Sequence, residues 1–311
     1  MNALLVEKNL EHHRSRYLVI ANKTGQVGNR LVLYAHMLGA AMERGWSLFN
    51  PSFVEYADFF IGTHGRLATC GAELTNPRTI NRAERQALFR VNRIGYQCSK
   101  VLGKIPHSGV GWAKAVEVLH YDLGELLDRA DARHWRILFT QNYHFRQHDW
   151  CAKHAAAIRA LLTPREPWRS QADGVVVDAR QAGEVLVGVH IRHGDYLHHL
   201  GGKFFYEVPA YAALMRRMVE LLAPQRVVFL VCSNARHQPS DFAGMTVRFG
   251  PGHLISDLHA LSGCDWLFGP PSSFSAWAAF YGSVRYHMVE DPTQTLQADD
   301  FAVPRSPDPR Y

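Results

Sequence analysis

The chain has 311 residues, 47% of them hydrophobic and 20% charged, so it is long enough for two domains and has the composition of a globular protein. These values exclude a disordered, collagen-like or disulfide-stabilised chain. No apolar stretch approaches the roughly 18 residues that span a bilayer, and the N-terminus becomes charged too early for a signal peptide. We therefore expect a cytoplasmic protein.

The cysteines, the net charge and the histidines narrow the classes of site and partner. An odd number of cysteines, five, without CxxC spacing favours reduced thiols over disulfides or a structural zinc site. The net charge of +6 favours an anionic partner, such as nucleotide phosphates, nucleic acid or acidic lipid. Nucleic acid is the weakest of these because no basic stripe is interleaved with aromatic residues. The histidines show no HExxH-type spacing, so we expect no metal site.

The first half of the chain opens with an α/β pattern. Residues 17–23 (YLVIANK) have the β-branched, apolar composition of a buried strand, and residues 25–30 (GQVGNR) form a glycine turn. Apolar residues then recur at three- and four-residue spacing, which predicts a helix over 31–45. Residues 46–53 resume as a second strand.

The middle of the chain is mostly helical from residue 78 to 165, with one strand signal at 136–141. Residues 163–174 are rich in proline and polar side chains and lack periodicity, so we interpret them as a linker. These patterns predict three parts: an N-terminal α/β lobe with a helical insertion (1–172), a C-terminal lobe (173–291) and an extended tail (292–311).

The C-terminal lobe alternates strand and helix throughout. Strands are expected at 184–191, 226–234, 246–250, 265–270 and 284–291, with helices at 208–222, 254–264 and 273–282. Such alternation favours a parallel sheet with helices on both faces, in which ligands bind at the carboxyl ends of the strands.

The stretch GVHIRHGDY (188–196) places charged side chains at the carboxyl end of the first strand of this lobe. Arg192 offers a planar guanidinium that can grip two phosphate oxygens, and His190 can donate or accept a hydrogen bond at the same edge. The alternative is that Arg192 and Asp195 pair only to fix the turn. Two further motifs favour an anion site.

The first of these motifs is GQVGNR, where glycines permit close backbone approach and the following helix directs free N–H groups at an anion. It matches neither the dinucleotide nor the Walker fingerprint, and a simple turn is its alternative interpretation. The second is PPSSFS (270–275), which sets Ser272, Ser273 and Ser275 around a helix start. One serine suffices for a helix cap, so three hydroxyls favour phosphate binding as well.

Three stretches, GQVGNR, HIRHGDY and SDLHALSGCDWLFGPPSSFSAWAAFYG, resemble in this order the α1,2-fucosyltransferases of glycosyltransferase family 11, within the superfamily that includes α1,6- and protein O-fucosyltransferases. The resemblance extends over residues 17–290, although the helical middle contributes little. It implies a GT-B-like α/β fold of two Rossmann-like lobes with a cleft between them. It also implies that the C-terminal lobe binds GDP-fucose, that the N-terminal lobe (1–172) contributes to the acceptor side, and that the enzyme inverts the sugar's configuration without a metal.

The resemblance also implies roles for individual residues. Arg192 corresponds to the arginine that holds the diphosphate and offsets charge as GDP leaves, which suits a metal-free enzyme. His190 and Asp257 correspond to guanine-contacting positions, Ser272 and Ser273 to phosphate-contacting ones, and Asn29, beside Gly28, to the glycine-loop residue that approaches the donor. A carboxylate at position 257 suits guanine because it can accept two parallel hydrogen bonds from N1 and the 2-amino group.

The pattern departs from many family members at His193, where they have a second arginine. This departure leaves the linkage and the donor sugar open. Our candidate for the general base is Asp195, because it follows the motif and can accept a hydroxyl proton; pairing with Arg192 is its alternative role.

We therefore expect an inverting, metal-independent transferase that moves fucose from GDP-fucose to a hydroxyl of a glycan, either free or lipid-linked. It would need no cofactor beyond the donor substrate and no nucleic acid, and peripheral association with the inner membrane is compatible with the sequence. The alternatives are a transferase that uses another nucleotide sugar and a nucleotide-binding homologue without turnover.

Overall fold

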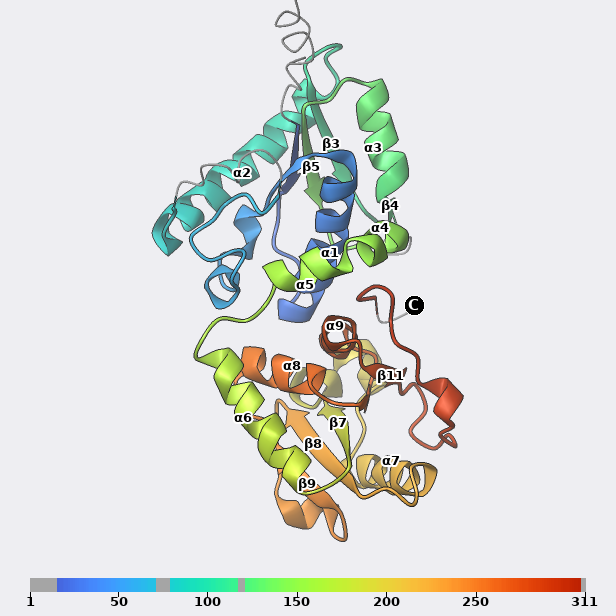
Figure 1. The fold of residues 1–311 in the computed structure, drawn as a ribbon. Coiled ribbons are helices and arrows are strands. Elements are labelled where there is room, and N and C mark those ends of the chain that lie inside the picture. The colour runs from blue at the N-terminus through green and yellow to red at the C-terminus, as the bar shows by residue number, and fades with distance from the viewer. Residues whose placement is uncertain (1–15, 71–78, 117–120, 309–311) are drawn as a thin grey trace, which may run out of the picture. The chain divides into compact units, whose positions relative to one another are not determined.

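The computed structural model describes residues 16–70, 79–116 and 121–308, and Figure 1 shows the course of the chain. The chain divides into two compact units. The first draws its members from Met1–Thr24, His36–Asp58 and Thr63–Trp150, and the second from Gly25–Ala35, Phe59–Gly62 and Cys151–Tyr311. The predicted limits at residues 172 and 291 come from the sequence pattern and stay predictions. The N-terminal segment used in the signal-peptide argument lies outside the described residues.

The first unit contains a parallel four-stranded sheet in the order β2-β1-β5-β3. Its strands are β1 (Tyr17–Ile20), β2 (Ser47–Phe49), β3 (Val110–Lys114) and β5 (Ile137–Gln141). The chain passes from β1 outward to β2 and later fills the other side with β3 and β5, so the winding changes direction between β1 and β5. The sequence pattern predicted all of these except β3, an edge strand whose Trp112 and Lys114 side chains are exposed.

Helices and a short pair of strands complete the first unit. They are α1 (Val27–Arg44), α2 (Arg82–Leu102), α3 (Leu123–Ala132), α4 (His148–Lys153), β4 (Tyr121–Asp122) and β6 (Phe145–Arg146). The helices α1 and α4 contribute residues to both units. The helix α2 begins in a capping box, in which Asn81 and Glu84 each accept a hydrogen bond from the other's amide at 2.9 Å. One face of α2 packs against β3 and β5, and its opposite face is exposed.

The second unit contains a parallel five-stranded sheet in the order β11-β10-β7-β8-β9. Its strands are β7 (Val185–Ile191), β8 (Val227–Ser233), β9 (Thr246–Phe249), β10 (Trp266–Gly269) and β11 (Arg285–Met288), and the sequence pattern predicted all five. The chain winds from β7 out to β9 and returns to β10 on the other side of β7. The winding therefore changes direction between β7 and β10.

The helices of this unit are α5 (Ala155–Leu161), α6 (Trp168–Gln181), α7 (Val208–Leu221), α8 (Leu254–Ser262) and α9 (Ser273–Gly282). The segment predicted as a linker is helical from Trp168 onward, so that prediction was wrong for its second half. Only Ala172 and Ala179 are buried in α6, which is why the segment shows no apolar periodicity.

Side chains of β7 alternate between two covered faces of the sheet, and the whole strand is buried. Val187 belongs to the core cluster that includes the apolar residues of α7. On the other face, Gly188 lies against Leu261 of α8, and His190 contacts Ser275 of α9. Even-numbered residues of β7 therefore face α8 and α9, and odd-numbered ones face α7.

The described part of the C-terminal tail packs on this unit. Leu296 and Phe301 join the core cluster, and Ala302 forms an antiparallel bridge with Tyr286 of β11. The five cysteines are free, as their spacing predicted. Within the part of the chain that the structure describes, no helix combines the length and hydropathy needed to cross a membrane.

Candidate active site

The change of winding between β7 and β10 marks the edge of the second sheet where a ligand is expected, because open α/β sheets bind ligands beside the carboxyl ends of such strands. The strand β7 ends at Ile191, directly before Arg192, and β10 ends at Gly269, three residues before Ser272. Neighbouring parallel strands end at the same edge of a sheet. The topology therefore brings together two of the motifs that the sequence singled out.

Arg192 is held in place by three neighbours. Its Nη2 donates to Gln26 Oε1 at 3.0 Å and to Asp195 Oδ2 at 3.0 Å, and Asp195 Oδ1 lies 2.9 Å from the same nitrogen. The guanidinium also lies 5.5 Å from the centre of the Tyr196 ring, within cation–π range. Among the described residues, Nη1 and Nε have no hydrogen-bond partner. The protein thus fixes one corner of the guanidinium and leaves three N–H donors for an anion.

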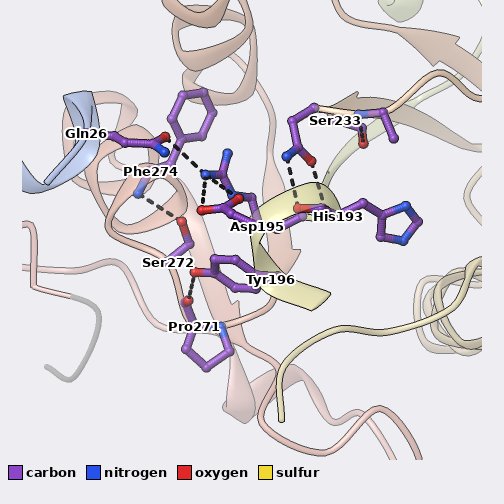
Figure 2. A network of polar contacts seen from close by, with 11 residues as sticks. Gln26, His193, Asp195, Tyr196, Ser233, Pro271, Ser272 and Phe274 are labelled. Carbon is purple, nitrogen blue, oxygen red and sulfur yellow. Dashed lines mark hydrogen bonds and ion pairs between the residues drawn. The ribbon is translucent and has the colours of Figure 1, made fainter. Parts of the chain in front are cut away.

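Tyr196 connects Arg192 to the start of α9. Its hydroxyl donates to the Pro271 carbonyl at 2.6 Å, and Figure 2 shows its ring between Asp195 and Pro271. Burial raises the pKa of this hydroxyl, against a smaller opposing effect of a hydrogen bond with Ser272, so it stays a donor. Ser272 caps α9 by accepting a hydrogen bond from the Phe274 amide at 3.2 Å. The positive end of the α9 dipole is therefore one residue away from the Tyr196 contact.

The glycine loop meets the same helix start. The Ser273 hydroxyl donates a short hydrogen bond to Asn29 Oδ1. A Cβ atom on Gly28 would lie 2.7 Å from the Phe274 amide nitrogen and 2.7 Å from Ser273 Oγ, so only glycine permits this approach. Gly28 and Asn29 belong to the first turn of α1, and this turn is part of the second unit. The N-terminal ends of α1 and α9 therefore converge, which concentrates positive dipole ends suited to an anion.

His190 and Ser275 lie behind this edge, in the core. The His190 ring Nδ1 is 2.6 Å from Ser275 Oγ, and the two residues are 4% and 0% exposed. Burial, reinforced by the charge of Arg192, lowers the pKa of His190 to about 3, so the ring is neutral near pH 7. These two side chains are hydrogen-bonded to each other. Their expected contacts with the nucleotide-sugar donor stay predictions.

Asp257 lies in the first turn of α8, close to the last residues of β8 and to the segment that follows β9. It is buried, and its Oδ1 accepts a hydrogen bond from the Gly252 amide at 2.8 Å. Burial raises its pKa to about 6. Within the described chain, no hydrogen bond joins it to Arg192 or to the serines at the start of α9. A half-satisfied buried carboxylate at this edge suits a ligand that brings N–H donors.

His193, at the position of the second arginine, does not face the same way as Arg192. Its ring Nε2 lies 2.9 Å from the Tyr206 carbonyl and its ring centre lies 4.8 Å from that of Phe205. Figure 2 shows this ring directed away from Asp195 and Tyr196. The alternation along β7 explains the difference, because an odd-numbered residue at this end points to the α7 face. Position 193 therefore adds no second cation beside Arg192.

The sequence reasoning missed Gln26 and Tyr196. Gln26 belongs to the motif GQVGNR and Tyr196 to GVHIRHGDY, but Gln26 is separated from Arg192 by 166 positions, and no local pattern reports that contact. An aromatic residue four positions after an arginine was the available signal for Tyr196. For the residues that the structure describes, no group of three or more His, Cys, Asp or Glu side chains is placed to hold a metal ion.

Comparison with known proteins assigns the chain to a family. The model described as glycosyl transferase family 11 matches residues 140–302, which is more than half of the chain and includes the whole second sheet. The chain belongs to glycosyl transferase family 11. As a family 11 member it is a glycosyltransferase, and the matched segment contains Arg192, Asp257 and the serine motif. No functionally curated protein is similar enough in sequence to match it.

Solved structures agree with this assignment at the level of the fold. A mutant of FUT1 from Arabidopsis thaliana in complex with GDP covers 94% of this chain and 74% of its own, with 12% identity and a TM-score of 0.57. The fucosyltransferase NodZ from Bradyrhizobium covers 89% and 96%, with 15% identity and a TM-score of 0.55. POFUT1 in complex with GDP-fucose covers 86% and 95%, with 12% identity and a TM-score of 0.53. The family 11 chain thus has the GT-B-like α/β fold of these fucosyltransferases.

Proposed function

We propose that the protein is an inverting fucosyltransferase that moves fucose from GDP-fucose to a hydroxyl group of a glycan, in an α1,2-type reaction. Family membership supports the transfer of a sugar, and the structures with the same fold include fucosyltransferases in complex with GDP and with GDP-fucose. The single observation that carries the proposal is the placement of Arg192, with three free N–H donors, beside the N-terminus of α9.

In this proposal the site acts on the charge that develops as GDP leaves. The free corner of Arg192 would bind diphosphate oxygens, and amides at the start of α9 would bind others from the side of Ser272 and Ser273. Charge on the leaving group is then offset by donors that are already oriented, which lowers the barrier most when they need not move. Because a guanidinium and two helix ends supply this stabilisation, we propose a reaction without a metal or other cofactor.

The remaining residues receive distinct roles. Asp257 would accept hydrogen bonds from the guanine N1 and 2-amino groups, which an adenine base does not offer in that pattern. Asn29 and Gly28 would hold the glycine loop against α9, where the loop's own amides reach the donor. For Asp195 we favour positioning of Arg192 over proton abstraction, since both carboxylate oxygens lie within 3.0 Å of Arg192 Nη2.

A thermal-shift series with GDP, UDP, ADP and their sugars tests the donor, because a ligand that binds only the folded state raises its stability by mass action. Selective stabilisation by GDP and GDP-fucose, followed by GDP release when a glycan mixture is added, is the expected result. A preference for UDP would replace the fucose donor by another nucleotide sugar. Stabilisation by GDP without any GDP release would indicate a nucleotide-binding homologue instead of an enzyme.

We also propose that the protein works in the cytoplasm, at the periphery of an anionic membrane, on free or lipid-linked glycans. The exposed face of α2 supports this. Val91, Ile94 and Val101 lie on one side of the helix, at spacings of three and seven residues, and Ile105 follows in the turn after it. Each of these four side chains is more than half exposed. Beside this α2 stripe, Arg90 and Lys104 are exposed and have no ion pair among the described residues. An apolar stripe with a basic border suits the surface of an anionic bilayer.

A further inference from the structure

The first unit has a cavity of about 500 Å³ at the carboxyl ends of β1 and β5. Ala21 and Asn22 follow β1 there, and Gln141 is the last residue of β5. These two strands are the neighbours between which the winding of the first sheet changes direction, which is where an open α/β sheet binds its ligand. The volume falls in the range of roughly 300–1,000 Å³ that is usual for small-molecule sites. None of the residues assigned to the donor site lines this cavity.

One wall of the cavity is formed by the buried side of α2. Tyr96 of this helix lines the cavity and is 3% exposed, and its hydroxyl oxygen is shielded from solvent and has no hydrogen-bond partner among the described residues. A ligand oxygen in the cavity does not reach this hydroxyl unless the surrounding side chains move. The polar contacts with a ligand therefore fall to the amide and guanidinium groups of the lining.

The other walls of the cavity suit a sugar. Phe89 and Tyr96 form an apolar wall, and the side-chain amides of Gln97 and Gln141 can donate and accept hydrogen bonds. The Asn22 amide is already engaged, because it donates to the Lys23 carbonyl and accepts from the Asn142 amide. A few polar groups that converge on an apolar wall are the usual composition of a site for a small polar molecule. Amides pair equally well with a hydroxyl that donates and one that accepts, which is the character of a sugar ring.

The charges around the cavity are positive. Lys23 and Arg93 line it, and the described residues of the lining include no carboxylate. Lys23 is paired with Glu55 and lies 4.9 Å from the centre of the Phe89 ring. Arg93 is exposed and has no ion pair in the described part of the chain. A guanidinium without a protein partner at the mouth of a sugar-sized cavity suits an anionic group on the ligand.

We propose that this cavity binds an acidic sugar unit of the glycan acceptor, with Arg93 on its anionic group and the side-chain amides of Gln97 and Gln141 on its hydroxyl groups. The inference rests on the proposed transferase function and adds the class of acceptor to it. A carboxylate and a phosphate ester can each accept two parallel hydrogen bonds from an arginine, so both kinds of acidic sugar fit the chemistry.

The test measures binding to the full chain by isothermal titration calorimetry with five probes: the acidic galacturonic acid, galactose 1-phosphate and 3′-sialyllactose, and the neutral galactose and lactose. We expect the acidic probes to bind at least tenfold more tightly than their neutral counterparts, with a gap that narrows as salt is added. The anion whose probe shows the larger gain in affinity over its neutral counterpart, carboxylate or phosphate, is the preferred one. Equal binding of acidic and neutral probes, or no binding of either, would overturn the proposal.

Three variants locate the site. We expect Arg93→Gln to weaken galacturonic acid binding about tenfold and galactose binding by less than twofold, and Gln141→Ala to weaken both by about fivefold. The control is Arg82→Gln, which removes an exposed charge from the same helix outside the cavity lining and should change neither. Thermal unfolding confirms folding of each variant. If Arg93→Gln binds the acidic probes as tightly as the wild type does, the proposal is wrong even where those probes bind.

GDP stabilisation, measured on the same preparations, separates this inference from the proposed function. Stabilisation by GDP together with no preference for acidic probes would remove the acidic acceptor and leave the transferase proposal in place. Binding of acidic probes that depends on Arg93, together with no response to GDP, would remove the donor assignment and leave a sugar site in the first unit.

Discussion

Gly28 approaches Phe274 so closely that a single methyl group would not fit between α1 and α9: an added Cβ would lie 2.7 Å from the Phe274 amide nitrogen. The nearest atoms are mostly backbone, which cannot rotate away as a side-chain end can. We therefore predict that Gly28→Ala destabilises the protein by about 1–3 kcal/mol, the usual cost of overpacking. Chemical denaturation monitored by circular dichroism measures it.

Gly174→Ala is the matched control for this prediction. Gly174 is also a helical glycine, in α6, and an added Cβ there meets nothing within 4 Å. Alanine is the better helix former, so this variant should gain about 0.5–1 kcal/mol. If both glycine variants change stability in the same direction, the close approach of α1 and α9 is not what fixes residue 28.

The contrast between these two glycines shows how much of the site the sequence could predict. The five strands of the second sheet and the place of Arg192 at the end of β7 were predictable, because strands buried on both faces are continuous apolar runs. The partner of Gly28 was not, because α9 is far away in the sequence. The same holds for the contact between Gln26 and Arg192. Local patterns report strands and turns, and they do not report which turns meet.

Two misses have a different cause. The strand β3 is a short edge strand with a central tryptophan that is partly exposed, so its apolar signal is weak. The sequence pattern predicts a linker at the start of α6, because prolines and polar residues outweigh its two buried alanines. In both cases the element is held by its neighbours more than by its own apolar pattern, and only the tertiary structure shows that.

For catalysis, we predict that Arg192→Ala lowers kcat by about 10²–10³, or roughly 3–4 kcal/mol, by analogy with the loss of an oxyanion donor. The guanidinium is expected to act on charge that develops only as GDP leaves, so KM for GDP-fucose should change much less than kcat. Steady-state kinetics with a coupled GDP-release assay gives both constants. An unchanged kcat would remove Arg192 from the reaction.

Asp195→Asn separates positioning from proton abstraction at the same site. If Asp195 only holds Arg192, the variant should lose less than about tenfold in kcat, similar to Gln26→Ala, which removes another contact of the same nitrogen. The pH–rate profile should keep its acidic limb in both variants. A loss of 10² or more that is confined to Asp195→Asn, together with a lost acidic limb, would make Asp195 the general base.

For the α2 stripe, we predict that the wild-type protein co-sediments with vesicles containing phosphatidylglycerol and much less with pure phosphatidylcholine, and that added salt weakens the binding. The double variant Ile94→Asp, Val101→Asp should bind at least tenfold less, because it places two charges on the apolar side. Val177→Asp, at an exposed apolar position of α6, is the control and should bind as the wild type does. Loss of self-association instead of vesicle binding would make this face a contact between copies of the chain.

The last prediction concerns Asp257, whose buried carboxyl has its pKa raised to about 6. Below that pH the free protein holds a proton on this group, and the proton must leave before the carboxylate can accept two hydrogen bonds from guanine. GDP affinity should therefore fall as the pH drops from 7 to 5, by about tenfold from this group, since one pH unit below the pKa corresponds to 1.36 kcal/mol. Calorimetric titrations at both pH values measure the change.

Asp257→Asn isolates that carboxylate from the titration of the GDP phosphate, which both proteins share. The variant should bind GDP more weakly at pH 7 and show a smaller loss of affinity toward pH 5. Inosine diphosphate, which lacks the 2-amino group, supplies the second control: the wild type should prefer GDP to it by on the order of tenfold, and the variant should not. A variant that keeps this preference would show that guanine is recognised elsewhere, whatever the pH dependence of the wild type.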